Sequence, residues 1–182
     1  AWTWEHQALV RARMIVGGAS LRAQFDAVRA GVLRRRRDRA ALAHEVVEMR
    51  DRMLRELSRG TATRFDLKQD RGGVADIEFM VQYGVLAGAS ATPTLVDYTD
   101  NIRLLEALAG AGELGADEAS LLTDAYRAFR ARIHRLALLD EAAIVEPDEE
   151  LVRLRDAVTR LWREWICARA AEPEGGAAPA AD

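Results

Sequence analysis

Cysteine, long apolar runs and net positive charge are scarce or missing in this chain of 182 residues, and each scarcity excludes something. The single cysteine, Cys167, rules out a disulfide within the chain and suits a reducing cytoplasm. No apolar run reaches the roughly 18 to 20 residues of a membrane span, and no secretory signal opens the chain. The net charge of -3 argues against a basic nucleic-acid binder. We therefore expect neither membrane nor nucleic acid as a partner.

The residue patterns of several catalytic sites are missing as well. The histidines His6, His44 and His134 are scattered without the spacing of zinc ligands. There is no G-x-S-x-G, and the one cysteine falls in a predicted terminal helix, so nucleophilic catalysis has no support. No D-x-D pair occurs anywhere in the chain. The sequence therefore predicts no catalytic residue and no metal ligand here.

Alanine, leucine, arginine and glutamate dominate, and only 4 prolines interrupt them, which favours helices. Apolar residues recur at spacings of three and four along most of the chain, as on the buried face of a helix. This pattern predicts an all-α bundle of about six or seven helices. The predicted helices cover residues 4–14, 21–33, from the cap Asp38 to Gly60, 74–86, from Thr99 or Asp100 through 109, 117–136, and from Pro147 and Asp148 through 166.

Some residues at the edges of these helices are open to two interpretations. The run Arg34–Arg37 is either a solvated helix end or a contact for an acidic partner. Trp162 and Trp165, three residues apart, are predicted to anchor the core. The chain opens within a helical pattern and without an initiator methionine, so we interpret it as a piece of a longer protein. We expect one helical domain over residues 1–171, and a disordered tail over residues 172–182, which are poor in apolar bulk.

The segment "RFDLKQDRGG" departs from the helical pattern. Residues 64–68 alternate between polar and apolar, as in a short strand, and the next five residues are typical of a turn. We therefore expect one short strand or hairpin to be inserted around residues 64–73.

This segment also holds Lys68, the only lysine among 26 lysine and arginine residues. Gly72 and Gly73 directly precede a predicted helix, where they let a ligand approach the free N–H groups of the helix start. A lysine adds a compact positive charge suited to phosphate oxygens. Lys68, Gly72 and Gly73 are thus a candidate nucleotide-binding site, although they do not form a P-loop. The alternative is a simple Gly-Gly turn beside a solvated lysine.

Two acids begin the apolar helix that follows. Asp76 and Glu78 need partners, because an unpaired buried charge costs several kcal/mol. Either they hold Mg²⁺ or position a nucleotide, or they are structural. In the structural case Asp76 stabilises the helix start and Glu78 pairs with a buried arginine, for which Arg11 and Arg13 are candidates. Gln82 lies on the same helix face as Glu78.

Two stretches carry a resemblance to the bacterial glutamine-synthetase adenylyltransferase family. "AWTWEHQALVRAR" (residues 1–13) resembles the segment after the second nucleotidyltransferase core of those enzymes. "FDLKQDRGGVADIEFMVQY" (residues 65–83) is similar to the family's signature near the C-terminus, and a shorter form occurs in related uridylyltransferases. "YTDNIRLLEALAGAG" and the tryptophan-rich last helix are also similar, so the resemblance extends to about residue 170.

The resemblance implies a bifunctional enzyme of nitrogen regulation in the cytoplasm, which attaches AMP to glutamine synthetase and removes it. The transfer would use ATP and Mg²⁺, with a tyrosine of glutamine synthetase attacking the α-phosphorus. The family holds its metal through a G-S…D-x-D pattern that these residues lack. The catalytic carboxylates are therefore expected in a core upstream, and this chain alone is expected to be inactive.

Two functions follow from this interpretation. In the first, the chain is a helical accessory domain whose Lys68, Gly72 and Gly73 face the upstream core, while Asp76 and Glu78 complete the site or lock the helix that presents it. In the alternative, the chain is a protein-interaction module that docks glutamine synthetase or the PII signal protein and takes no direct part in chemistry.

Overall fold

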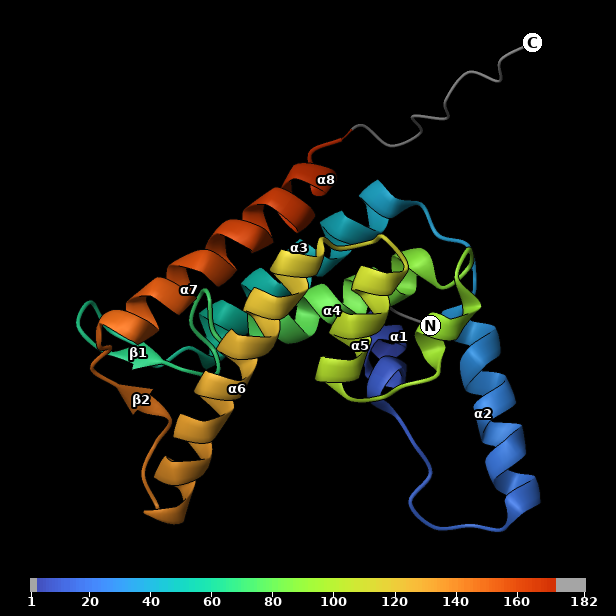
Figure 1. The fold of residues 1–182 in the computed structure, drawn as a ribbon, viewed down its shortest axis with the longest axis horizontal. Helices are drawn as coiled ribbons and strands as arrows, with labels where there is room; N and C mark the ends of the chain where they lie inside the picture. Colours follow the sequence, from blue (N-terminus) through green and yellow to red (C-terminus); the bar gives the residue numbers. More distant parts are fainter. Residues whose placement is uncertain (1–2, 173–182) are drawn as a thin grey trace.

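Helix α4 (Val74–Gly88) is the central element of the fold. Thirteen of its 15 residues are buried, which is the burial expected of a helix that is apolar on every side. The computed structural model describes residues 3–172, and in it α4 is surrounded by most of the other helices (Figure 1). The all-α prediction is confirmed.

The helices around α4 follow the chain in order. They are α1 (Thr3–Arg11), α2 (Ala19–Leu33), α3 (Arg39–Leu57), the short 3-10 turn η1 (Pro93–Val96), α5 (Asn101–Gly110), α6 (Ala116–Leu138) and α7 (Glu149–Trp162), which continues through the π-helical turn η2 (Arg163–Cys167) into α8 (Ala168–Ala170).

Aspartates cap three of these helices where the sequence predicted caps. The carboxylates of Asp38, Asp100 and Asp148 each accept the backbone N–H three residues later, at 2.9, 3.0 and 2.9 Å. Asp100, not Thr99, is therefore the cap of α5. Each cap satisfies an N–H that would otherwise lack a partner at the helix start.

The strand predicted in the inserted segment is present, but no hairpin forms there. β1 (Phe65–Asp66) pairs antiparallel with β2 (Ile144–Val145), with Phe65 opposite Val145. The "QDRGG" turn leads directly into α4 instead of into a second strand. A two-residue strand has too few residues to show a pattern, so the sequence gave no sign of the partner beyond α6.

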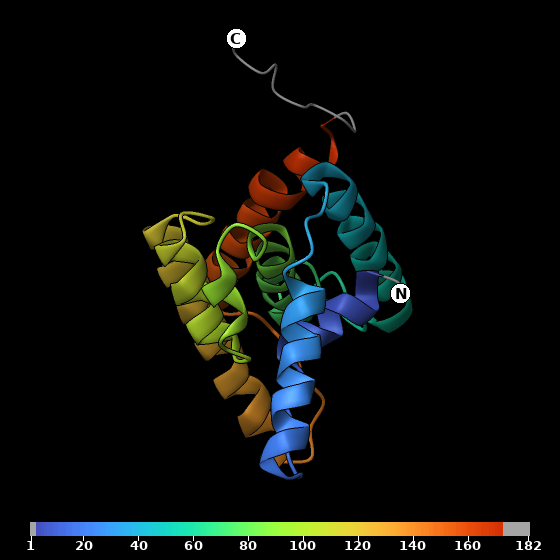
Figure 2. The same cartoon turned by 90° about the vertical axis from the view of Figure 1, so that its right-hand side faces the viewer.

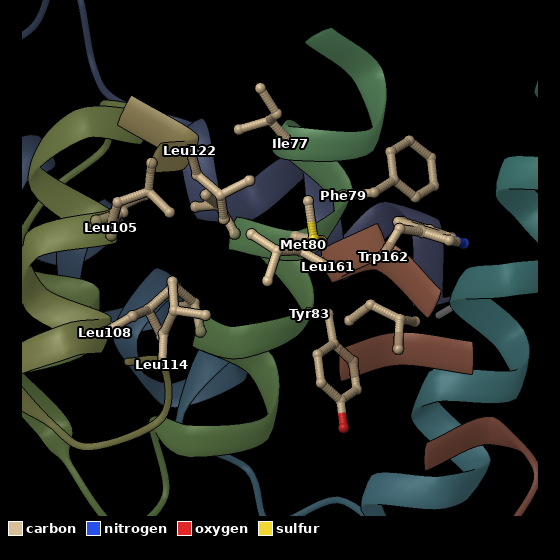
Figure 3. Close-up of a cluster of buried hydrophobic side chains, with 14 of the residues drawn as sticks. Ile77, Phe79, Met80, Tyr83, Leu105, Leu108, Leu114, Leu122, Leu161 and Trp162 are labelled. Carbon is tan, nitrogen blue, oxygen red and sulfur yellow. The ribbon is translucent and has the colours of Figure 1, made fainter. Parts of the chain in front are cut away.

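The core fills the space between α4 and the later helices. Ile77, Met80 and Tyr83 of α4 face side chains of α5, α6 and α7 (Figure 3). Trp162 is buried, and the ring of Trp165 meets the ring of Tyr83 edge-on with centroids 5.8 Å apart. Both tryptophans thus anchor the core, as the sequence predicted.

Helix α2 is the exception to this close packing. It projects from the bundle in both views (Figures 1 and 2). Only Arg29 and Leu33 of its residues are buried, and both lie in its C-terminal half. None of the helices within residues 3–172 is both long and apolar enough to cross a membrane. The predicted disordered tail falls, apart from Glu172, outside the described residues.

Candidate functional site

The loop between β1 and α4 is held in place by its own aspartates. Asp66 is buried, and its Oδ1 accepts the backbone N–H groups of Lys68 and Gln69, both at 3.0 Å. The Oδ2 of Asp70 accepts the N–H of Asp66 at 2.9 Å, and Ser58 donates its hydroxyl to the other oxygen of Asp70. These bonds fix the backbone on which Lys68 is presented.

The two glycines of the loop are needed for contacts with the chain itself. Gly72 has a φ of +78°, and a Cβ at this position would lie 2.3 Å from the carbonyl oxygen of Arg155 in α7. A Cβ on Gly73 would lie 2.8 Å from the carbonyl oxygen of Leu67. Close packing therefore explains the Gly-Gly pair without any ligand.

The N–H groups at the start of α4 are already occupied. The N–H of Gly72 donates to the Oδ2 of Asp76 at 2.7 Å, and the N–H of Gly73 donates to the carbonyl of Asp70 at 3.0 Å. The next two N–H groups, of residues 74 and 75, donate to the carbonyls of Leu67 and Lys68. The expectation of free N–H groups aimed at a ligand is therefore wrong, because the loop folds back over the helix start.

Lys68 remains the accessible group of the predicted trio. Its side chain is exposed, and no salt bridge joins its ammonium to an acid within residues 3–172. Its backbone is fixed on both sides, by Asp66 at the N–H and by Ala75 at the carbonyl. The structure thus displays a mobile cation on a rigid support.

Asp76 is buried in an ion pair with an arginine that sequence reasoning missed. Both Asp76 and Arg50 of α3 have side chains that are 0% exposed, and Arg50 Nε donates to Asp76 Oδ1 at 2.6 Å. Arg50 also donates to the carbonyl of Gln69 at 2.7 Å. Both carboxylate oxygens of Asp76 are thus taken by donors of the chain, which supports the structural interpretation of this residue.

A second arginine completes this cluster. Arg71 Nη1 lies 3.8 Å from Asp76, its other nitrogen pairs with Asp51, and its guanidinium stacks over the ring of Trp162. Burial lowers the pKa of Arg71, although the charge of Asp76 acts in the opposite direction. The cluster therefore ties the loop to α3 and α7 at once.

The sequence did contain a signal for Arg50. It lies four residues after Val46 and eight after Leu42, on the apolar stripe that predicted the buried face of α3. An arginine on such a stripe needs a buried acid as a partner. The stripe was instead extended to Leu57, which is 46% exposed, so that part of the prediction is wrong.

Glu78 pairs with α1, as one of the alternatives predicted. Its Oε1 accepts from Arg11 at 2.6 Å and from Asn101 at 3.3 Å, and the hydroxyl of Tyr126 lies 3.5 Å away. One turn later, Gln82 accepts from Gln7 of α1 at 3.2 Å. Arg11, not Arg13, is thus the partner, and the two stretches that carry the family resemblance are in contact.

Asp76 and Glu78 therefore belong to two separate clusters. Within residues 3–172, no group of three or more His, Cys, Asp and Glu side chains is arranged to hold a metal ion. What the site offers is one exposed ammonium on a loop that an ion pair and two glycines hold against the bundle.

The Arg34–Arg37 run is partly used within the fold. Arg37 donates to the carbonyls of Val32 and Leu33 at the end of α2, and Arg34 donates to the carbonyl of Pro93. Burial lowers the pKa of Arg37, and the nearby Arg35 adds to this effect. Both interpretations of the run thus hold in part, since two of its arginines support the helix end.

A helical bundle built on this loop and this ion pair defines a known class of domain. Residues 40–144, from α3 to β2, match the family model of GlnD PII-uridylyltransferase, and the chain belongs to that family. Residues 1–28 match a second family model, that of glutamate-ammonia ligase adenylyltransferase.

Individual relatives point to one kind of enzyme. The chain is 54% identical over 162 residues to a bifunctional glutamine synthetase adenylyltransferase/adenylyl-removing enzyme of Nitrosococcus oceani, covering 89% of this chain and 17% of the relative. It is 49% identical to the Pseudomonas aeruginosa enzyme of the same description, covering 90% of this chain and 18% of the relative. It is 52% identical to that of Thioalkalivibrio sulfidiphilus, with 90% and 17% covered. The chain spans about a sixth of the length of the curated relatives it matches.

Proposed function

We propose that residues 1–171 form the helical accessory domain of a bifunctional enzyme that adenylylates glutamine synthetase and removes the AMP again. The observation that carries this proposal is the identity of about half of all residues, over nine-tenths of the chain, to enzymes of that description. In this proposal a nucleotidyltransferase core precedes the domain, and the enzyme acts in the cytoplasm in nitrogen regulation.

The core would hold ATP and Mg²⁺ through its own carboxylates, and this chain alone would be inactive. Lys68 would reach the nucleotide phosphates, since its ammonium is exposed and without an acidic partner among the described residues. Gly72 and Gly73 would contribute by shaping the loop that presents Lys68. Asp76 and Glu78 would lock α4 beneath that loop.

The test is Lys68→Ala in the full-length polypeptide. Loss of a charge-assisted hydrogen bond to phosphate costs about 1.5–3 kcal/mol, so we expect adenylylation to fall roughly ten- to a hundredfold. The melting temperature should change little, because the Lys68 side chain is exposed. Activity is measured as AMP incorporated into glutamine synthetase.

Arg59→Ala is the matched control. Arg59 is an exposed cation whose backbone N–H bonds to Asp66 of the same loop, at 3.3 Å. Its loss should leave adenylylation unchanged. Wild-type turnover in Lys68→Ala would remove the nucleotide role. If Arg34→Glu then abolished binding of glutamine synthetase or PII, the domain would act as an interaction module.

A further inference from the structure

The exposed face of α2 carries a stripe of apolar side chains. Leu21 and Val28 are 56% and 66% exposed, and Phe25 lies between them, half-buried, on the same side of the helix. The loop before α2 adds Ile15 and Val16, which are 73% and 85% exposed. We call these five residues the α2 stripe. Single exposed apolar residues are ordinary on proteins, but a row of them marks an interaction surface.

The position of α2 is fixed although this face is bare. Arg29 is buried at the base of the helix and donates to the carbonyls of Leu9, Val10 and Val96 at 2.8, 2.6 and 2.6 Å. Burial lowers the pKa of Arg29, and the nearby Asp26 opposes that effect. These bonds join α2 to α1 and to η1, so the helix is held at a set angle to the bundle.

The N-terminal half of α2 gains little from the bundle. Residues 19–28 contain no buried side chain. Isolated helices shorter than about 12–15 residues are marginal in water, because most helical stability comes from packing an apolar face. A further surface against the stripe would supply that packing.

The family matches indicate which surface this is. The adenylyltransferase model covers residues 1–28 and ends at Val28, the last residue of the stripe, whereas the model of the bundle begins at residue 40. A stretch of 28 residues is too short to bury a core of its own, since domains below about 40 residues need other support. By sequence, α1 and the bare half of α2 thus belong to a unit whose remainder lies outside these residues.

We propose that the α2 stripe is the docking surface for an apolar patch of the adenylyltransferase core, the occupant that the proposed function places before this domain. The stripe contains no charged residue, so the matching patch on the core is apolar instead of acidic. This inference rests on the proposed function, but it concerns contact with the core and not the nucleotide.

The docking surface is separate from the Lys68 loop. β1, next to that loop, and α2 lie at opposite ends of the long axis of the molecule (Figure 1). The contact at α2 and the chemistry at Lys68 can therefore be tested independently.

The experiment compares hydrogen exchange of residues 19–28 in the full-length enzyme and in the 182-residue chain. The stripe variant is Leu21→Glu with Val28→Glu. Its control is Ala23→Glu with Ala27→Glu, which places the same charges on the opposite, exposed face of α2. We expect exchange at least tenfold slower in the full-length enzyme than in the chain alone, with the protection lost in the stripe variant and kept in the control.

Equal exchange in the full-length enzyme and the isolated chain would overturn the proposal. So would a concentration-dependent dimer of the isolated chain that the stripe variant abolishes, because the occupant would then be a second copy. If protection is found but the enzyme does not adenylylate glutamine synthetase, the docking stands and the proposed function fails. If the enzyme is active but α2 is unprotected, only the docking fails.

Discussion

Arginine carries most of the structural work at the scale of single residues. Arg50, Arg29 and Arg37 each turn a buried or half-buried guanidinium toward oxygens of the chain. A guanidinium has five donors in a planar fork, so one residue can bond several carbonyls or a carboxylate at once. Lysine could not replace these bonds, and the one lysine is on the surface.

The pair of Arg50 and Asp76 gives the clearest prediction at this scale. Asp76→Asn leaves Arg50 as a buried charge without its partner, and breaking such a pair costs about 3–5 kcal/mol. We expect the free energy of unfolding, measured by urea titration, to fall by that amount.

Asp51→Asn serves as the control for that variant. Asp51 pairs with Arg71, but its side chain is 38% exposed, and exposed pairs contribute only about 0–1 kcal/mol. The change should therefore be small. An Asp76→Asn protein as stable as the wild type would show that Asp76 does not lock α4, and would reopen its assignment to a ligand.

At the scale of elements, the start of α4 is shaped by what lies against it. Its first N–H groups are bonded to the loop, and α7 lies directly over Gly72. A buried helix start with its donors satisfied is the ordinary requirement of a protein interior. The paired glycines therefore serve the meeting of a loop and two helices, and the lysine beside them is the group left free.

A pair of alanine substitutions separates packing from flexibility at this scale. Gly72→Ala places a Cβ against the backbone of α7 in a left-handed conformation, which alone costs about 1–2 kcal/mol, so we expect a loss of at least about 2 kcal/mol. Gly31→Ala in α2 meets open space and should gain about 0.5–1 kcal/mol. Both follow from thermal unfolding.

The outcome for Gly72→Ala also bears on the nucleotide. If that variant keeps wild-type stability but loses adenylylation in the full-length enzyme, the glycine contacts the ligand after all. Lost stability in the isolated chain, where no nucleotide is present, assigns the residue to the fold.

The whole molecule is a bundle with one well-packed centre and one projecting helix. α4 is buried nearly throughout, whereas the first ten residues of α2 have no buried side chain. Local stability follows burial, because a segment with few packed side chains opens without disturbing the rest.

This contrast predicts the hydrogen exchange of the isolated chain. Amides of α4 should exchange only through global unfolding, and their exchange should follow the stability measured by urea. Amides of residues 19–28 should exchange by local opening and should not respond to Asp76→Asn. Uniform protection along both helices would contradict this arrangement.

The sequence by itself determined the helices and much of their capping. Period-three-to-four spacing and aspartate caps are local features, so they survive in a single chain without any tertiary information. The same holds for the buried character of α4, and for Arg11 as a partner of Glu78, since an acid on an apolar helix must find a cation.

The tertiary structure alone decided which distant groups meet. The pairing of β1 with β2, the burial of Arg29, the pairing of Arg50 with Asp76 and the use of the α4 N–H groups by the preceding loop all join segments remote in sequence or folded back on each other. These contacts depend on how helix lengths and angles bring side chains together, and no local spacing encodes that. For the same reason only the assembled bundle shows that the apolar face of α2 is left bare.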